Sequence, residues 1–160
     1  MSNIFMKVKG IEGDASATGY SGWIRLSSVS IKNSRNVDMK IGKMSDREGN
    51  APKFEEIEIS KQLDKASNGL FQKSCQDKAI SEVEIHVCTT GSELSPYFKL
   101  LLSDVIISEH HTHAMADVKP VESLRLSFSK IQRSFIGYDK NKQAQAPNTI
   151  SYDLSTAQMV

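Results

Sequence analysis

Apolar and polar side chains alternate at a period of two along much of this chain. Successive side chains of a β-strand point to opposite faces, so the alternation indicates strands with one buried and one solvated face. On this basis the side chain of His86 is expected on a solvated face, whereas Phe5, like the other aromatic residues, is expected in the core or at a contact between subunits. The apolar members of the three clearest runs are Ile4, Met6 and Val8, then Ile57 and Ile59, then Val83, Ile85 and Val87.

Two later segments predict longer strands. Residues 98–108 are mostly apolar, and the polar pair Ser103-Asp104 inside them predicts a β-bulge. Residues 123–135 alternate over two strand lengths. We expect the two segments to pair or to lie side by side.

The pattern changes to a spacing of three and four between Ile59 and Val83, which predicts one α-helix. Asp64 is the expected cap at its start, and Gly69 is expected to make its middle irregular or kinked. Several strands at short spacing with a single helix predict an all-β fold, either a β-barrel or a sandwich, with the helix over one open end. The apolar helix positions are Leu63, Ala66, Leu70, Phe71 and Cys75.

The strand expected between Gly22 and Lys32 changes phase in its middle. Ile24 and Leu26 are in phase with each other, whereas Val29 and Ile31 are one residue out of step with them. A bulge near Ser27-Ser28 lets both pairs face the core. The same bulge places Ser28, Ser30 and Lys32 together on the opposite, solvated face.

Residues 33–52 form a polar segment that retains only a weak alternation at Val37, Met39 and Ile41. It exceeds the usual length of a connection inside a compact domain. Segments of this kind are disordered or contact another chain. We therefore expect a long extended loop that takes part in contacts between subunits.

The length of 160 residues fits one domain, residues 1–160. The net charge of +1 supplies no long-range attraction for nucleic acid or anionic lipid. The first residues carry charge and lack the apolar stretch of a signal peptide, and no segment is long enough to cross a bilayer. We expect folding in the cytoplasm, no membrane anchoring, and any export without a cleaved signal. Cys75 and Cys88 lie in apolar contexts and are expected to be buried free thiols.

The histidine-rich stretch from His110 to His113 is the main candidate for metal chemistry. On an extended strand His111 and His113 share a face and His110 points away. The pair lacks further ligands, so we expect a solvated loop that follows a strand end, and no bound metal. The sequence also lacks the motifs of a serine or cysteine nucleophile and of a phosphate-binding loop. No catalytic residue and no cofactor are expected.

Three ordered sets of residues resemble one protein family. The first runs from Ile4 through Gly10 and Gly13 to Trp23, and the second is Asp64-Lys-Ala-Ser67 followed by the strand that ends at Cys88. The third joins residues 98–108 to the run Glu122-Ser-Leu-Arg-Leu-Ser-Phe-Ser-Lys-Ile131. Together these sets resemble the haemolysin-coregulated protein (Hcp) family, the tube protein of bacterial type VI secretion.

The resemblance implies an assembly in addition to a fold. It implies a small antiparallel β-barrel with one helix that forms a homohexameric ring, stacks into a tube, and is secreted. The expected partners are other copies of the chain, secreted effectors carried in the ring lumen, a VgrG-like spike protein and sheath proteins. The family's lumenal serine corresponds to Ser30, so Ser28, Ser30 and Lys32 are the expected cargo-binding residues. The expected loop residues at the contacts between rings or subunits are Val37, Met39, Ile41, Lys43, Met44 and Arg47.

Two other classes of function remain open on the sequence. One is a metal-dependent or hydrolytic enzyme that uses the cluster from His110 to His113. The other is a ligand-binding β-domain that acts alone. Metal content separates the first from a tube subunit, and oligomeric state separates the second.

Overall fold

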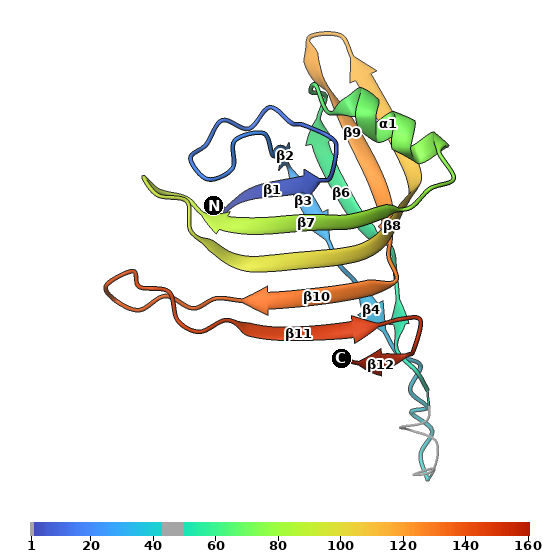
Figure 1. Cartoon of the computed structure of the whole chain (residues 1–160). Coiled ribbons are helices and arrows are strands. Elements are labelled where there is room, and N and C mark those ends of the chain that lie inside the picture. Colours follow the sequence, from blue (N-terminus) through green and yellow to red (C-terminus); the bar gives the residue numbers. More distant parts are fainter. Residues whose placement is uncertain (1, 43–49) are drawn as a thin grey trace.

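The computed structural model describes residues 2–42 and 50–160, and Figure 1 shows that strands make up most of it. The described residues contain one helix, α1 (Ser67–Cys75), which the helical spacing predicted. The strands are β1 (Ser2–Val8), β2 (Ile24–Leu26), β3 (Ser28–Ser30), β4 (Asn33–Ser34), β5 (Lys53–Phe54), β6 (Ile57–Gln62), β7 (Ile80–Thr89), β8 (Pro96–Met115), β9 (Val118–Ser127), β10 (Lys130–Phe135), β11 (Asn148–Asp153) and β12 (Gln158–Met159).

The strands form two antiparallel layers that share the long strand β8. Sheet A has the order β12-β11-β10-β8-β7-β1-β2 and uses the first half of β8. Sheet B continues from the second half of β8 to β9, β6 and β3. In Figure 1 the strands of sheet A run across the view, while β3, β6 and β9 cross them steeply. The all-β prediction with one helix is confirmed, but the sheet does not close into the complete barrel that we expected.

Two bends carry the chain from one layer to the other. Ser27 separates β2 from β3, as the phase change predicted, so that Ile24 and Leu26 are buried and Val29 packs against the same core. Asp104 adopts a positive φ of 51° at the predicted irregularity in β8. Its Oδ2 accepts a hydrogen bond of 2.8 Å from Ser129 Oγ, and β8 leaves β10 at this point. The register shifts in the pairing of β8 with β9 lie further along, between Ile107 and Glu109 and between His113 and Met115.

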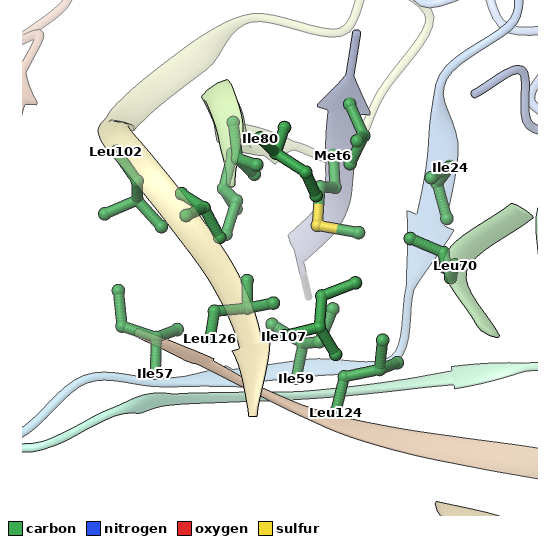
Figure 2. Packing of buried hydrophobic residues seen from close by; sticks show 14 of the residues in the cluster. Met6, Ile24, Ile57, Ile59, Leu70, Ile80, Leu102, Ile107, Leu124 and Leu126 are labelled. Carbon is green, nitrogen blue, oxygen red and sulfur yellow. The ribbon is translucent and has the colours of Figure 1, made fainter. Parts of the chain in front are cut away.

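The main core lies where the two layers and α1 meet. Figure 2 shows Met6 and Ile24 of sheet A, Ile59 and Leu124 of sheet B, and Leu70 of α1 directed into one cluster. Each of these side chains is almost completely buried, which contributes about 1.5–3 kcal/mol per large aliphatic residue. The alternation of the sequence is therefore confirmed on the inner faces of β1, β6 and β7.

A second, smaller core covers the other face of β1 and β7. It contains Phe5, Ala15, Tyr20 and Cys88. The rings of Phe5 and Tyr20 stack with centroids 4.4 Å apart, and the Tyr20 hydroxyl lies 2.9 Å from His86 Nδ1. Phe5 lies in this core, as expected for the aromatic side chains, but the prediction that His86 faces solvent is wrong, because residues 11–23 fold back over this face. Burial raises the pKa of Tyr20 and lowers the pKa of His86.

Helix α1 is continuous, so the predicted kink at Gly69 does not form. A Cβ at Gly69 would lie 3.3 Å from the side chain of Ile11, so glycine allows close packing here. Asp64 precedes the helix, and its Oδ1 accepts a hydrogen bond of 2.9 Å from the backbone N–H of Ala66. Both cysteines are free as predicted, but only Cys88 is buried. Cys75 is exposed, because it ends the helix on its outer side.

The long segment after β3 begins and ends as a small hairpin. Strands β4 and β5 pair with each other, and the described residues that follow β4, 35–42, extend away from the two layers (Figure 1). Val37, Met39 and Ile41 are exposed there, and Met39 retains 78% of its accessible surface. The predicted contact residues Lys43, Met44 and Arg47 lie outside the described residues. Within the described part of the chain, no helix has the length and apolar character needed to cross a membrane.

Candidate functional site

The outer face of sheet B brings together residues that are far apart in the sequence. Along one line across the sheet, Ser28 pairs with Ser60, Ser60 with Ser123, and Ser123 with His111. We call this line the hydroxyl row. The oxygens Ser28 Oγ and Ser60 Oγ are 2.5 Å apart, so a hydrogen bond links β3 to β6 at the start of the row. The predicted solvated face with Ser28 and Ser30 is therefore confirmed, and it extends over four strands.

A second line, which we call the charged row, runs beside the hydroxyl row. It contains Ser30, Glu58, Arg125 and Glu109 in cross-strand register. Arg125 donates to both carboxylates, with 2.7 Å from its terminal nitrogen to Glu58 Oε1 and 2.8 Å from Nε to Glu109 Oε2. Arg125 is about half exposed, so each pair contributes little to stability. The bridges nevertheless fix the side chains of three neighbouring strands.

Ser30 and Lys32 line an open cleft at the end of the charged row. The cleft has a volume of about 580 Å³, and Phe54, Glu58 and Arg125 are among its other lining residues. Lys32 Nζ lies 3.7 Å from Glu55 Oε1, and both side chains are largely exposed. Lys32 thus shares the solvated side of the chain with Ser28 and Ser30, as predicted. The arrangement offers hydroxyls and loosely paired charges to a partner.

The histidine-rich stretch lies on β8 and not on the expected solvated loop. Pairing with β9 continues through Met115, so the strand simply runs further than its apolar part. The register shift after Ile107 directs Glu109, His111 and His113 outward, and the two imidazole rings stand with centroids 6.3 Å apart. Residues 2–42 and 50–160 contain no group of three side chains that could hold a metal ion.

His110 points to the opposite side of β8, as predicted, and joins a buried polar network under α1. Its Nε2 lies 2.8 Å from Glu122 Oε2, and its ring packs against Phe71. The other oxygen of Glu122 accepts hydrogen bonds from Lys61 Nζ and Ser67 Oγ, each at 2.5 Å. Lys61 also donates to Asp64 Oδ1 at 2.8 Å. The network therefore joins β6, β8 and β9 to the start of the helix.

The network contains a serine, a lysine, a carboxylate and a histidine, yet it cannot act on a substrate where it lies. The side chains of Lys61 and Glu122 are completely buried. Burial alone would raise the pKa of Glu122, but the hydrogen bonds from Lys61 and Ser67, the charge of Lys61 and the contact with His110 together lower this pKa. Glu122 is thus held as a buried carboxylate that accepts hydrogen bonds. This is the chemistry of a structural link between elements.

Sequence reasoning found the two ends of the hydroxyl row and missed its middle. Ser60 follows Ile59 and Ser123 precedes Leu124, and this alternation places each serine on a solvated face but gives no further information. Their contribution depends on which strands pair and in which register, and the period of a strand does not contain that information. Arg125 was missed for the same reason.

The family comparison identifies the type of protein. The family described as "Type VI secretion system effector, Hcp" matches residues 5–135. No curated protein matches the sequence significantly.

Solved structures match over nearly the whole chain. A type six secretion system protein superposes with a TM-score of 0.93 at 15% identity, and the match covers 100% of both chains. Hcp1 from Salmonella typhimurium gives a TM-score of 0.78 at 19% identity over 99% of both chains. A type VI secretion system effector from Yersinia pestis gives 0.75 at 19% identity over 94% of this chain and 98% of that one. At these identities the structures establish a shared fold.

Proposed function

This chain belongs to the Hcp family of type VI secretion, and from that membership we propose that it forms a homohexameric ring whose stacked copies build the inner tube and carry effectors in the lumen. The family consists of structural tube proteins that are secreted by this system and are not enzymes. The proposal adds the ring, the tube and the cargo to that family assignment. Spike and sheath proteins are its further partners.

Two exposed apolar side chains on sheet A, Phe135 and Ile150, which flank Arg133, support a contact between subunits. Leu100 of β8 is buried in the core on the inner face of sheet A. On the same face, Arg133 of β10 pairs with Leu100, and Ile150 of β11 pairs with Arg133. Phe135, on the same face, pairs with Phe98. Phe135 and Ile150 are more than half exposed because no further layer of the same chain covers them. A second copy that covers this area removes apolar surface from water.

A ring requires that each subunit use two different surfaces for its two neighbours. Such heterologous contacts, repeated with a fixed rotation, close into a ring. The open edges of sheet A are β2 at one side and β12 at the other, so the two sides of the subunit offer different strands. The strand order of sheet A is therefore compatible with a ring in which one side of each subunit contacts the other side of its neighbour.

We assign the lumen to the outer face of sheet B. Ser28, Ser30 and Lys32 lie on one solvated side, and the cleft beside Ser30 is open to solvent. Its hydroxyls and paired charges offer hydrogen-bond donors and acceptors to a cargo protein. The long loop carries Val37, Met39 and Ile41 away from the body, where they can reach an adjacent ring.

Light scattering combined with electron microscopy tests the assembly. We expect a species with the mass of six chains and ring-shaped particles with a central opening. A strict monomer at high concentration would contradict the ring and would favour a binding domain that acts alone.

Cargo binding is tested with Ser30→Gln. The longer side chain fills part of the open cleft that Ser30 lines at the end of the charged row. We therefore expect less effector in the secreted fraction while the rings persist. Ser81→Gln, at an exposed position of β7, is the matched control and should leave the effector level unchanged. An unchanged effector level with Ser30→Gln would remove the proposed role of this residue.

A further inference from the structure

We infer that the loop of one copy of the chain, residues 35–42, docks onto an apolar patch at the opposite end of sheet B in another copy. The patch consists of Leu63, Phe71, Met115 and Val118, and we call it the hairpin patch because it lies beside the turn between β8 and β9. The inference rests on the proposed stacking of rings and deepens it, because it names the surface that receives the loop.

The hairpin patch lies where β8 and β9 run past the edge of the core. Its two strand residues pair with each other next to the turn. The backbone N–H of Leu63 donates a hydrogen bond of 3.0 Å to the carbonyl oxygen of Pro120, and the ring of Phe71 lies 5.8 Å from the ring of His110. All four patch side chains are exposed, and three of them retain more than half of their accessible surface. Exposed apolar side chains that gather in one place are typical of a surface that meets another protein.

The loop and the hairpin patch lie at opposite ends of sheet B. Strand β6 follows β5 at the loop end and finishes at Gln62, which pairs with Val121 near the hairpin patch. The six residues of β6 span about 20 Å. Figure 1 shows the loop leaving one end of the molecule, with α1 and the turn between β8 and β9 at the other end. The described part of the loop therefore does not cover the hairpin patch of its own chain.

The loop carries apolar side chains that suit such a patch. Val37, Met39 and Ile41 alternate with polar residues, so an extended segment presents all three on one face. All three are exposed. Docking on the hairpin patch of another copy removes both sets of apolar side chains from water together.

The charges beside the two surfaces are complementary when the segments run in opposite directions. The loop contains Asp38-Met39-Lys40, and the hairpin contains Asp117-Val118-Lys119, so both have the order acid, apolar, base. An antiparallel alignment places each acid opposite a base and the two apolar side chains opposite each other. Within residues 2–42 and 50–160, none of these four charged side chains forms an ion pair. Exposed pairs of this kind contribute little affinity, but they select the direction of docking.

A contact between two different surfaces at opposite ends of the chain can repeat without limit. Each copy then uses its loop on one neighbour and its hairpin patch on the next, which is a heterologous contact. Rings that carry loops at one rim and hairpin patches at the other therefore stack in a single direction.

Disulfide crosslinking between two engineered cysteines tests the contact. Both variants carry Cys75→Ser, because Cys75 is exposed. Preformed rings of Met39→Cys are mixed with rings of Val118→Cys under mild oxidation, and a non-reducing gel measures the species of two chains. We expect at least about fivefold more of this species than with Met39→Cys and Ser81→Cys, a control pair in which the second cysteine is at an exposed position of β7.

Two results would overturn the inference: a yield no higher than that of the control pair, or equal crosslinking of Met39→Cys protein alone, which would show that two loops contact each other. A charge exchange gives a second measurement that needs no cysteine. Asp38→Lys should raise the concentration needed for stacking about two- to fivefold, and Lys119→Asp in the same chain should restore it. Light scattering judges the rings separately, so intact rings that stack without the crosslink would refute this inference alone.

Discussion

At the scale of single residues, the buried network around Lys61 and Glu122 is the most consequential feature. A charge in the protein interior is tolerated only when a partner and hydrogen bonds replace the lost water. Here Lys61, Ser67 and His110 all contact Glu122, and no buried polar side chain of the described residues lacks a partner. Lys61 also contacts both Asp64, which precedes α1, and Ser67, the first residue of α1, so the network ties the start of the helix to β6.

We predict that Lys61→Met lowers the free energy of unfolding by about 3–5 kcal/mol at pH 7, because Glu122 is left as a buried charge without its main partner. The double variant Lys61→Met/Glu122→Leu should cost much less, since both charges are removed. Urea unfolding measures both values. Lys65→Met, at an exposed site 3.9 Å from Glu12, is the control and should change little. Equal losses in the single and the double variant would contradict the assignment.

The same network makes a prediction about pH. The pKa of Glu122 is lower in the folded chain than in an unfolded one, where a glutamate titrates near 4.3. The stabilisation from this group is therefore complete above about pH 4.3 and is lost as the pH falls through the folded value. Wild-type protein should lose this part of its stability in acid, and Lys61→Met/Glu122→Leu should not. Unfolding curves between pH 3 and pH 7 compare the two slopes.

At the scale of elements, residues 11–23 act as a cover for the second core. The segment is held by backbone hydrogen bonds from Gly13 N to Gly22 O at 2.8 Å and from Ala15 N to Trp23 O at 3.0 Å. A Cβ at Gly13 would overlap the carbonyl oxygen of Trp23 and lie 2.7 Å from Ile24 Cα. Glycine is required here because two stretches of backbone approach each other closely.

We predict that Gly13→Ala lowers the free energy of unfolding by about 2–3 kcal/mol, because the backbone must move to admit the methyl group. Gly19→Ala is the control. It also lies in this segment and has a φ of +85°, but nothing lies within 4 Å of its Cβ position. That change should cost only about 1 kcal/mol from the backbone conformation. Chemical denaturation measures the free energy of unfolding of both variants. Equal losses would show that the close contact with the backbone of Trp23 is unimportant.

At the scale of the whole molecule, the two layers leave several apolar side chains that their own chain does not cover. Two groups of them differ in geometry. Phe135 and Ile150 belong to a rigid sheet, whereas Val37, Met39 and Ile41 lie on the extended loop. The sheet suits the lateral contact within a ring, and the loop suits the contact between rings. Ring closure and stacking should therefore be separable by mutation.

We predict that Val37→Ser/Met39→Ser/Ile41→Ser leaves the hexamer intact but raises the concentration needed for stacking by about tenfold or more, since three exposed apolar side chains lose their contacts. Light scattering measures the ring, and electron microscopy measures the stacks. Lys40→Ser in the same loop is the matched control. Loss of the hexamer itself would move the loop into the lateral contact.

The sequence determined which side chains share a face of a strand, that the phase changes at Ser27 between β2 and β3, and that one helix lies between β6 and β7. These features depend on local periodicity, which can be read from a short run of neighbouring residues. Only the tertiary structure decided that His111 lies in line with Ser28, that His86 is buried, that Cys75 is exposed, and that the sheet stays open. Each of these depends on strand register or on a distant segment that packs over the site, and such long-range pairing leaves no periodic trace in the chain.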